Sequence, residues 1–371
     1  MTTVRFFCAP ILTAALTFSS TTASACTFIS LTGSDGTVVA ARTMEWGSFD
    51  LLPVMTFLPA GTELSGMDMP DGKPGASWTA RYDVTGVTLL DQMLFGDGMN
   101  SEGLSISLLY LPGFAEFQDY LPDQAANSIA PPDFVGYMLS QFATVAEVQE
   151  ALQSVRVVPI VTPELGMAAP VHYAITDKSG DEIIVEYVDG ELNIHEETLG
   201  VMTNSPPYDW HVTNVRNYLN LRAVDWPTIE VEGIDMAPIG VGTGMIGLPG
   251  DYTPPSRFIR ALAWTQTSRP TTGGSDTVSE VMRILDSFQL PLPSADENPN
   301  PSELAPLEYS ATQYTVAYDL KNLTVYFHTS DNPAIRSVSM TAFDFDAAPQ
   351  PVNIPMRNPG MAYAIDVTPN P

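Results

Sequence analysis

Cys26 has the residue type and the place along the chain to combine two catalytic groups in one residue. The 25 residues before it carry one charge, Arg5, followed by an apolar run over 6–18 and the small residues Ala23-Ser24-Ala25. This order predicts a secretory signal peptide over residues 1–25 that is removed after export. Cys26 would then carry a thiol and a free α-amine, whose ordinary pKa of about 8 lets it accept a proton near neutral pH. Nucleophile and general base would thus belong to the same residue.

Cleavage after Ala25 also bears on where the protein acts. The apolar run is too short to span a bilayer as a helix, so we predict an exported protein, periplasmic or secreted, with no membrane attachment once the signal is removed. Cleavage removes Cys8 as well, which leaves no partner for an internal disulfide. An alternative keeps Cys26 at the N-terminus: a lipoprotein whose cysteine is acylated, although Ala23 stands where such sites usually have a leucine-like residue.

Arg42 and Glu45 are the first candidates for partners of Cys26. The segments on either side of the turn residues 33–36 alternate in polarity and are rich in β-branched residues, which predicts a β-hairpin. In an antiparallel hairpin, the strand end that carries Arg42 returns beside Cys26. A guanidinium there would stabilise a thiolate, and the carboxylate of Glu45 would hold or orient the α-amine. The alternative is an ordinary ion pair at a strand end, which contributes little at a surface.

Two residues farther along the chain suit an attack on an amide carbonyl. Asn204 follows a predicted strand and precedes a proline pair. Its side-chain NH2 is a suitable donor to an oxyanion, and the alternative is a turn asparagine. Arg257 falls at the start of a predicted helix, where a cation opposes the helix dipole. This unfavourable placement indicates a functional reason for the arginine.

The elements that position these residues are mostly strands, with helices between them. Alternating polarity predicts strands over 51–60, 102–112, 171–177, 182–189, 192–197, 314–320 and 323–329. Helices are predicted over 132–142, from Thr144 onward, over 254–266 and over 277–288, with capping boxes at Thr144–Glu147 and Thr277–Glu280. Runs of strands with separate helix pairs favour stacked layers in an α+β fold over βαβ units. Pro291–Pro306 and the tail after Ala347 are predicted as surface loops.

Composition and the remaining motifs exclude several classes of protein. The 371 residues include 15 Lys and Arg against 43 Asp and Glu, a net charge of −28, which argues against nucleic acid and anionic membranes as partners. Gly242–Gly247 matches a dinucleotide-binding pattern, but Pro249 and Gly250 prevent the helix that such a site requires. None of the four histidines has zinc-ligand spacing, and neither cofactor nor metal is predicted. No linker divides residues 26–371, so we predict one domain with a Pro-rich C-terminal tail.

The chain resembles the choloylglycine hydrolase family, which contains bile salt hydrolases, penicillin V acylases and their relatives. The resemblance runs from Cys26 to at least Phe327 and rests on these motifs in order: CTFISL, ARTMEWG, DGMNSEGLSISLLYLP, TNSPPYDWHVTNVRNYLNLR and GTGMIGLPGDYTPPSRFIRA. It implies the N-terminal nucleophile hydrolase fold, which is a four-layer αββα sandwich, and it suggests a homotetramer. It also implies that the protein hydrolyses linear amides without a cofactor or metal.

The resemblance implies a role for each candidate residue. Cys26 would be the nucleophile and, through its amine, the base. Arg42 matches the arginine beside the nucleophile, and Arg257 matches the second arginine of the site. Asn204 matches the asparagine of the oxyanion hole.

Two positions bear on the substrate that the resemblance implies. Glu45 stands where many family members have aspartate, which adds one methylene near the amine. Tyr110 stands where penicillin V acylases have tyrosine and bile salt hydrolases usually have asparagine, and its N–H or side chain would complete the oxyanion hole. With the export signal, Tyr110 favours a penicillin V acylase that also cleaves acyl-homoserine lactones. The apolar segments 51–60 and 108–117 suit a pocket for an apolar acyl group or, alternatively, belong to the core.

Three alternatives stay open from the sequence. Conjugated bile salts would be the substrate if the pocket loops select them. The same thioester would serve an acyltransferase if an acceptor other than water attacks it. In a different class of protein, the chain would be an exported lipoprotein or binding protein that keeps the fold without catalysis.

Overall fold

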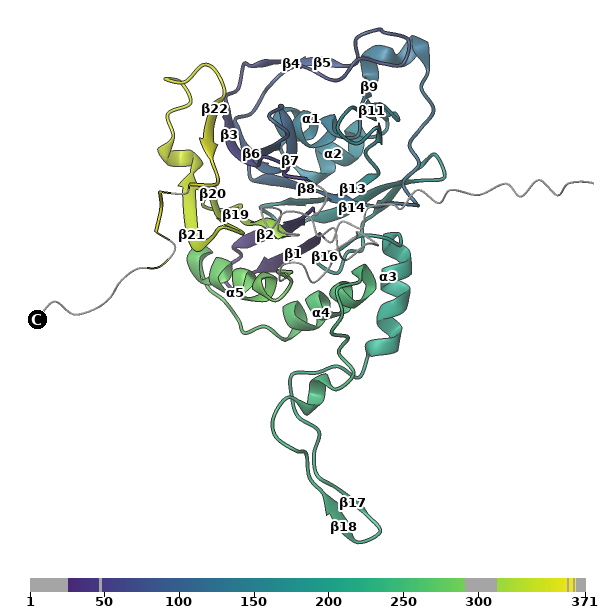
Figure 1. Ribbon diagram of the computed structural model, residues 1–371, viewed down its shortest axis with the longest axis vertical. Coiled ribbons are helices and arrows are strands. Elements are labelled where there is room, and N and C mark those ends of the chain that lie inside the picture. The colour runs from purple at the N-terminus through teal and green to yellow at the C-terminus, as the bar shows by residue number, and fades with distance from the viewer. Residues whose placement is uncertain (1–25, 47–48, 291–311, 359, 363, 365–371) are drawn as a thin grey trace, which may run out of the picture.

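Two β-sheets lie face to face at the centre of the molecule, and helices cover the outer face of each (Figure 1). In this computed structural model the six-stranded sheet has the order β16 (Val201–Met202), β1 (Thr27–Thr32), β2 (Val38–Glu45), β19 (Thr312–Asp319), β20 (Thr324–Thr329) and β21 (Asn332–Ser339). The eight-stranded sheet has the order β15 (Glu191–His195), β14 (Glu182–Val188), β13 (Val171–Asp177), β8 (Leu104–Tyr110), β7 (Leu94–Asn100), β6 (Val84–Leu89), β3 (Val54–Leu58) and β22 (Val352–Pro355). Neighbouring strands in both sheets are antiparallel.

Helices form the two outer layers. α1 (Asp133–Gln141) and α2 (Val145–Ala151) pack on the eight-stranded sheet, and α4 (Pro254–Thr267) and α5 (Gly274–Asp286) pack on the six-stranded sheet (Figure 1). α3 (Tyr208–Val215) lies against α4. The predicted α+β fold and the four-layer αββα sandwich are both confirmed.

The structure describes residues 26–46, 49–290, 312–358, 360–362 and 364. The predicted signal peptide over 1–25 and the predicted loop Pro291–Pro306 lie outside the described residues. Short strand pairs flank the sandwich: β4 (Glu63–Ser65) with β5 (Ser77–Thr79), β9 (Ser128–Ile129) with β10 (Arg156–Val157), β11 (Val161–Thr162) with β12 (Met167–Ala168), and β17 (Ile229–Val231) with β18 (Ile234–Met236). Short 3-10 helices span Pro122–Asn127, Arg216–Tyr218, Thr243–Met245 and Met340–Ala342.

The predicted hairpin of β1 and β2 is confirmed and lies inside the sandwich. All eight residues of β2 are buried, because the strand lies between β1 and β19 and contacts both α5 and β8. Thr27 faces Thr43, and Phe28 faces Arg42. This register places the residue before Thr27, which is Cys26, beside the C-terminal end of β2.

Most predicted helices are found, but one predicted start is wrong. The capping box of α2 is confirmed, since Thr144 Oγ1 accepts a hydrogen bond from the backbone N–H of Glu147 at 3.2 Å. The capping box predicted at Thr277–Glu280 is wrong, because α5 already begins at Gly274. Thr277 Oγ1 instead donates to the carbonyl of Gly273, which has a φ of +80° that the sequence pattern did not indicate.

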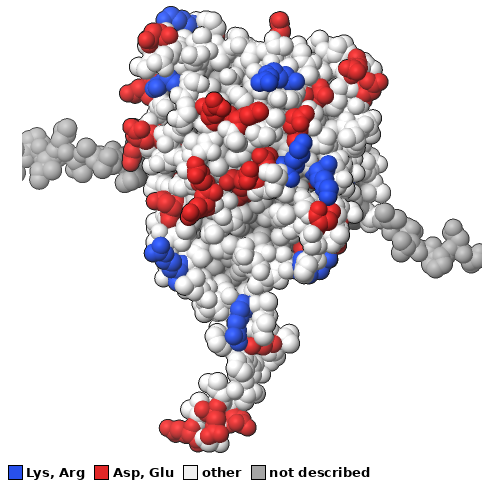
Figure 2. Space-filling model, turned by 180° about the vertical axis from the view of Figure 1, so that it is seen from behind, with Lys and Arg blue, Asp and Glu red and all other residues white. Residues whose placement is uncertain are grey.

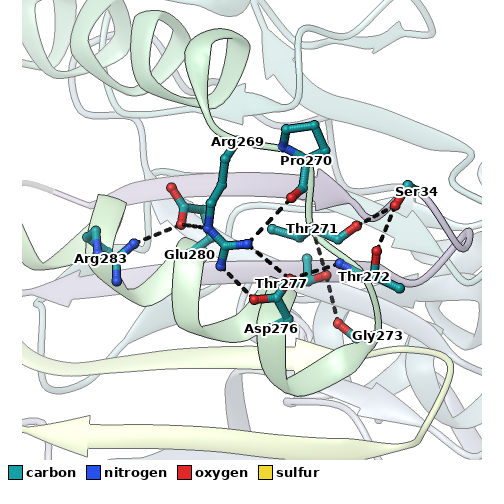
Figure 3. A network of polar contacts seen from close by, with 10 residues as sticks. All are labelled: Ser34, Arg269, Pro270, Thr271, Thr272, Gly273, Asp276, Thr277, Glu280 and Arg283. Carbon is teal, nitrogen blue, oxygen red and sulfur yellow. Dashed lines mark hydrogen bonds and ion pairs between the residues drawn. The ribbon is translucent and has the colours of Figure 1, made fainter.

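Polar contacts tie the start of α5 to the turn between β1 and β2 (Figure 3). Arg269 Nε donates to Glu280 Oε2 at 3.1 Å and Nη2 lies 2.6 Å from Asp276 Oδ1. Ser34 Oγ donates to the carbonyl of Thr271 at 2.7 Å. Glu280, which the capping box would have used, is therefore engaged in an ion pair with Arg269.

The prediction of a surface loop after Ala347 is partly wrong. β22 adds to the edge of the eight-stranded sheet, where Val352 pairs with Phe57 of β3. Phe343, just before this segment, stacks on Phe57 with ring centroids 4.3 Å apart. The proline at the end of β22, Pro355, is compatible with a strand that lies at a sheet edge.

A hairpin arm extends away from the sandwich (Figure 1). We call residues 226–243 the arm; it carries β17 and β18, and its apolar side chains Ile229, Val231, Ile234 and Met236 are exposed. Acidic side chains cover its tip (Figure 2). Within the described part of the chain, no helix combines the length and the apolar character needed to cross a membrane.

Candidate active site

Cys26 is buried at the inner end of the β1–β2 hairpin, with 2% of its surface exposed. Its Sγ lies 3.9 Å from the carbonyl oxygen of Glu45, the last residue of β2. Its own carbonyl oxygen accepts a hydrogen bond from Nη1 of Arg257. The hairpin therefore brings one end of β2 to Cys26, and α4 brings an arginine to the same place.

Arg42 is fully buried between the two sheets. Its Nη1 donates to the carbonyl of Leu108 on β8 at 2.6 Å and lies 3.6 Å from Oδ2 of Asp97 on β7. Burial alone would lower the pKa of Arg42, but the charges of neighbouring groups, first among them Cys26, raise it above its ordinary value. The guanidinium therefore remains positively charged beside the thiol.

Arg257 links the start of β1 to Asn204. Its Nη1 donates to Thr27 Oγ1 at 2.9 Å, and its Nη2 donates to Asn204 Oδ1 at 2.6 Å. Burial lowers the pKa of Arg257 to about 10, and the charges of Glu45 and Cys26 oppose this shift. The arginine lies in the first turn of α4, where the helix dipole disfavours a positive charge. It is fully buried and points into the site.

Asn204 and Tyr110 are joined across the two sheets. Asn204 follows β16 of the six-stranded sheet, and its Nδ2 donates to the carbonyl of Tyr110, the last residue of β8, at 2.7 Å. The Tyr110 ring meets Trp46 edge-on, with centroids 5.3 Å apart. Asn204 is thus held through both side-chain atoms, by Arg257 at Oδ1 and by Tyr110 at Nδ2.

Glu45 is buried in the same cluster. Its Oε1 accepts a hydrogen bond from Thr312 Oγ1 on β19 at 3.2 Å. Burial raises the pKa of Glu45 to about 7, although Arg257 and Arg42 act in the opposite direction. The carboxyl group can therefore exchange a proton near neutral pH, next to the residue whose amine signal removal would expose.

An apolar cavity lies against Cys26. Its walls include Trp46 and Tyr110, then Leu89, Leu90 and Leu94 from the β6–β7 hairpin, and Thr162, Leu165 and Ala169 from the β11–β12 region. Most of these residues come from the eight-stranded sheet and its loops, whereas Cys26, Arg42, Asn204 and Arg257 come from the six-stranded sheet and the helix on it. The cavity suits an apolar group whose carbonyl carbon would lie near Sγ.

Residues 26–352 match the sequence model of the linear amide C–N hydrolases, choloylglycine hydrolase family. The chain belongs to this family. It is 32% identical over 270 residues to a bile salt hydrolase/transferase of Clostridium perfringens (strain 13 / Type A). The aligned region covers 72% of this chain and 80% of that protein. It is 26% identical to a penicillin V acylase of Pectobacterium atrosepticum, over 96% of this chain and 89% of that protein.

Solved structures of choloylglycine hydrolases share the fold. A variant of the conjugated bile acid hydrolase from Clostridium perfringens superimposes with a TM-score of 0.77 at 27% identity, over 93% of this chain and 100% of that one. The resemblance that the motifs indicated is confirmed at the level of the family, the fold and the hydrolysis of linear amides.

The glycine pattern at Gly242–Gly247 is part of a loop at the base of the arm. Asp225 Oδ1 accepts hydrogen bonds from the backbone N–H groups of Gly242 and Thr243, both at 2.7 Å. A carboxylate of the chain thus occupies the donors that a phosphate would need. Among the residues that the structure describes, no three His, Cys, Asp or Glu side chains gather as a metal site requires.

Sequence reasoning missed Asp97, which lies within a family motif but was given no role. Its carboxylate accepts hydrogen bonds from Tyr314 and Tyr318 on β19 and faces Arg42 on β2. Burial raises the pKa of Asp97, and the charge of Arg42 opposes the shift. A lone acidic residue inside an apolar strand was the available signal, but its partners depend on how the two sheets stack.

Proposed function

We propose that the mature protein hydrolyses linear amides with an apolar acyl group, using Cys26 as an N-terminal nucleophile. The observation that carries this proposal is that Cys26 lines the apolar cavity while two buried arginines, Arg42 and Arg257, lie beside it. An acyl group in the cavity would present its carbonyl to a sulfur whose thiolate form both positive charges favour.

The mechanism starts with the α-amine of Cys26 taking the proton of its own thiol, after which sulfur attacks the amide carbonyl. Asn204 supplies the oxyanion with the second hydrogen of its side-chain NH2, since the first is bonded to Tyr110. Tyr110 completes the oxyanion hole through its backbone N–H or its side chain. The amine then protonates the leaving nitrogen, and water hydrolyses the thioester. Glu45 holds and orients the amine.

We expect the substrates to be those of a penicillin V acylase, together with acyl-homoserine lactones. Two aromatic rings, Trp46 and Tyr110, and several leucines line the cavity and would contact an aryl or alkyl chain. Conjugated bile salts are the second candidate, because relatives such as the Clostridium perfringens protein are named bile salt hydrolase/transferase. The word transferase in these names supports acyl transfer from the thioester to an amine as a further reaction.

The proposal includes processing and assembly. Cleavage after Ala25 would follow export to the periplasm or the medium and would create the amine that the mechanism needs. Assembly as a homotetramer is supported by the arm, whose exposed apolar side chains Ile229, Val231, Ile234 and Met236 would be covered by other copies of the chain.

The test begins with intact mass and N-terminal sequencing of the exported protein, followed by incubation with penicillin V, a long-chain acyl-homoserine lactone and a conjugated bile salt. A chain that starts at an unmodified Cys26 and cleaves one of them supports the proposal and selects its substrate class. Adding a primary amine and analysing the products separates transfer from hydrolysis. A lipidated or uncleaved N-terminus contradicts the mechanism. A protein that starts at an unmodified Cys26 and cleaves none of the three compounds contradicts the proposed substrate classes and favours the binding protein.

A further inference from the structure

Histidines hold the backbone of Asn204 on both sides. The carbonyl oxygen of Thr203 lies 3.0 Å from His172 Nε2, and the carbonyl oxygen of Asn204 lies 2.8 Å from His211 Nε2. All four residues are buried. The two carbonyls belong to the rigid peptide planes before and after the Asn204 Cα. Holding both planes therefore fixes the two backbone torsions that aim its side chain.

His172 lies between two hydrogen-bond acceptors. Its Nδ1 lies 2.8 Å from Glu186 Oε1, and its Nε2 bonds to the carbonyl of Thr203. Burial alone would raise the pKa of Glu186, but hydrogen bonds from His172 and His195 lower it to about 2, so this carboxylate is ionised. Neither an ionised carboxylate nor a carbonyl can donate, so the imidazole of His172 is the donor in this arrangement.

The same carboxylate extends the clamp to the next helix. Glu186 Oε2 accepts a hydrogen bond from the backbone N–H of Tyr208, the first residue of α3, at 3.0 Å. The buried pair of His172 on β13 and Glu186 on β14 thus anchors the chain before Asn204, through Thr203, and after it, through Tyr208.

His211 holds the second carbonyl as a neutral ring. Burial lowers the pKa of His211 to about 4, so near neutral pH the ring carries one proton, which Nε2 donates to Asn204. The ring stacks on Phe258 of α4, with centroids 4.7 Å apart and planes at 6°. Phe258 directly follows Arg257, the residue that holds Asn204 Oδ1. α4 therefore supports Asn204 in two ways: Arg257 holds its side-chain oxygen, and Phe258 packs on the ring of His211, which holds its carbonyl.

We propose that His172 and His211 are positioning residues that set the direction of the Asn204 side-chain amide. The inference rests on the proposed function, because it takes Asn204 as the oxyanion donor. A donor that is already oriented stabilises the transition state without reorganising. Because this stabilisation arises in the transition state, loss of the orientation should lower kcat and leave KM nearly unchanged.

The first test compares His211→Phe with His211→Gln. Phenylalanine keeps a flat ring on Phe258 but removes the donor, whereas glutamine keeps a donor without the ring. We expect His211→Phe to lower kcat by about ten- to a hundredfold with KM within about twofold, and His211→Gln to retain more of kcat. An unchanged kcat in His211→Phe overturns the proposal.

The rate of Cys26 alkylation by iodoacetamide provides a readout that general damage would move. Alkylation needs the thiolate but forms no oxyanion, so both His211 variants should react at the wild-type rate. A rate that falls in parallel with kcat would show that His211 supports the nucleophile or the fold as a whole, and would overturn the positioning role.

The second test addresses His172. His172→Gln takes the imidazole away from the buried carboxylate of Glu186, so the double variant His172→Gln/Glu186→Gln, which also removes that charge, restores stability relative to the single variant. We expect the double variant to keep wild-type alkylation and to show a lower kcat, because Thr203 is held less rigidly. A double variant with the wild-type kcat overturns the role of His172.

Asn204→Ala and crystallography separate failure of this inference from failure of the proposed function. If the wild-type protein cleaves no amide, or Asn204→Ala keeps the wild-type kcat, the proposed function or its oxyanion donor is wrong. The position of Asn204 is then read from crystal structures of the wild type and His211→Phe. An amide that moves away from Tyr110 in the variant supports positioning, and an amide that stays about 2.7 Å from it contradicts positioning.

Discussion

Arginines lie near both ends of the β1–β2 hairpin, but in different surroundings. At the inner end, Arg42 and Arg257 are fully buried and donate to backbone carbonyls, a threonine hydroxyl and an asparagine oxygen. At the turn end, Arg269 is about half exposed and forms ion pairs with Asp276 and Glu280 on α5 (Figure 3).

The difference teaches how each end responds to mutation. A buried arginine leaves several unpaired polar groups behind when it is removed, and these groups cannot turn to water. An exposed ion pair is replaced by hydration at little cost. The inner end should therefore control activity, and the turn end should contribute little to either activity or stability.

The largest effect should come from Cys26 itself. Cys26→Ser should lower kcat by at least about a thousandfold because the hydroxyl is a far weaker nucleophile, and Cys26→Ala should abolish turnover while the protein stays folded. Amide cleavage assays and thermal unfolding measure the two. Adding one residue before Cys26 should also silence the enzyme, since an amide nitrogen cannot act as the base. Full activity in Cys26→Ser would remove the nucleophile assignment.

Arg257→Lys should have the next largest effect. Lysine keeps the charge but cannot bridge Thr27 and Asn204 as the guanidinium does, so we expect kcat to fall by about ten- to a hundredfold. Arg260→Lys is the matched control on the same helix, because Arg260 donates to the carbonyls of Pro249 and Asp251, away from Cys26. Equal losses of kcat in the two variants would mean that α4, and not its contact with Asn204, matters.

Glu45→Gln should change how stability depends on pH. The pKa of Glu45 is raised from 4.5 to about 7 in the folded protein, so its proton stabilises the folded state below pH 4.5, and this stabilisation is lost as the pH rises through about 7. Glutamine cannot lose a proton, so the variant should gain stability relative to the wild type between pH 4.5 and 7. Urea unfolding of both proteins across this range measures the difference. A constant difference would show that Glu45 is ionised throughout.

The smallest effect is expected at the turn end. Arg269→Ala should lower the Tm by no more than about 2 °C and leave kcat and KM unchanged, because Arg269 and Asp276 are open to solvent and the buried Glu280 keeps its ion pair with Arg283 at 2.9 Å. Raising the salt concentration should shrink even this shift. A loss of activity in Arg269→Ala would show that the two ends of the hairpin are coupled.

The sequence predicted the parts of the fold that depend on neighbours in the chain. The β1–β2 hairpin and the cap of α2 follow from local patterns, and with the hairpin came the proximity of Arg42 and Glu45 to Cys26. The start of α5 was misplaced because the pattern at Thr277 outweighed a glycine whose positive φ is visible only in the structure.

The rest of the site depends on contacts between distant segments. Arg257 meets Asn204 across 53 residues and Asn204 meets Tyr110 across 94, and no periodicity reports such pairs. Asn204 and Arg257 were singled out from their residue types and local positions, whereas Tyr110 was proposed only because the motifs resemble a known family. The clamp of His172 and His211 was missed because each histidine, taken alone, has the features of an ordinary core residue.

The division of the site between two sheets has a consequence for protein engineering. The wall residues Leu89, Leu90 and Leu94 are the last residue of β6, a residue of the turn and the first residue of β7, while the reacting groups are carried by the other sheet and its helix. A saturation library at these three leucines would explore new acyl chains without touching the nucleophile or its arginines. Leu90 has a φ of +62°, so glycine and asparagine should be enriched there among the best-folded clones.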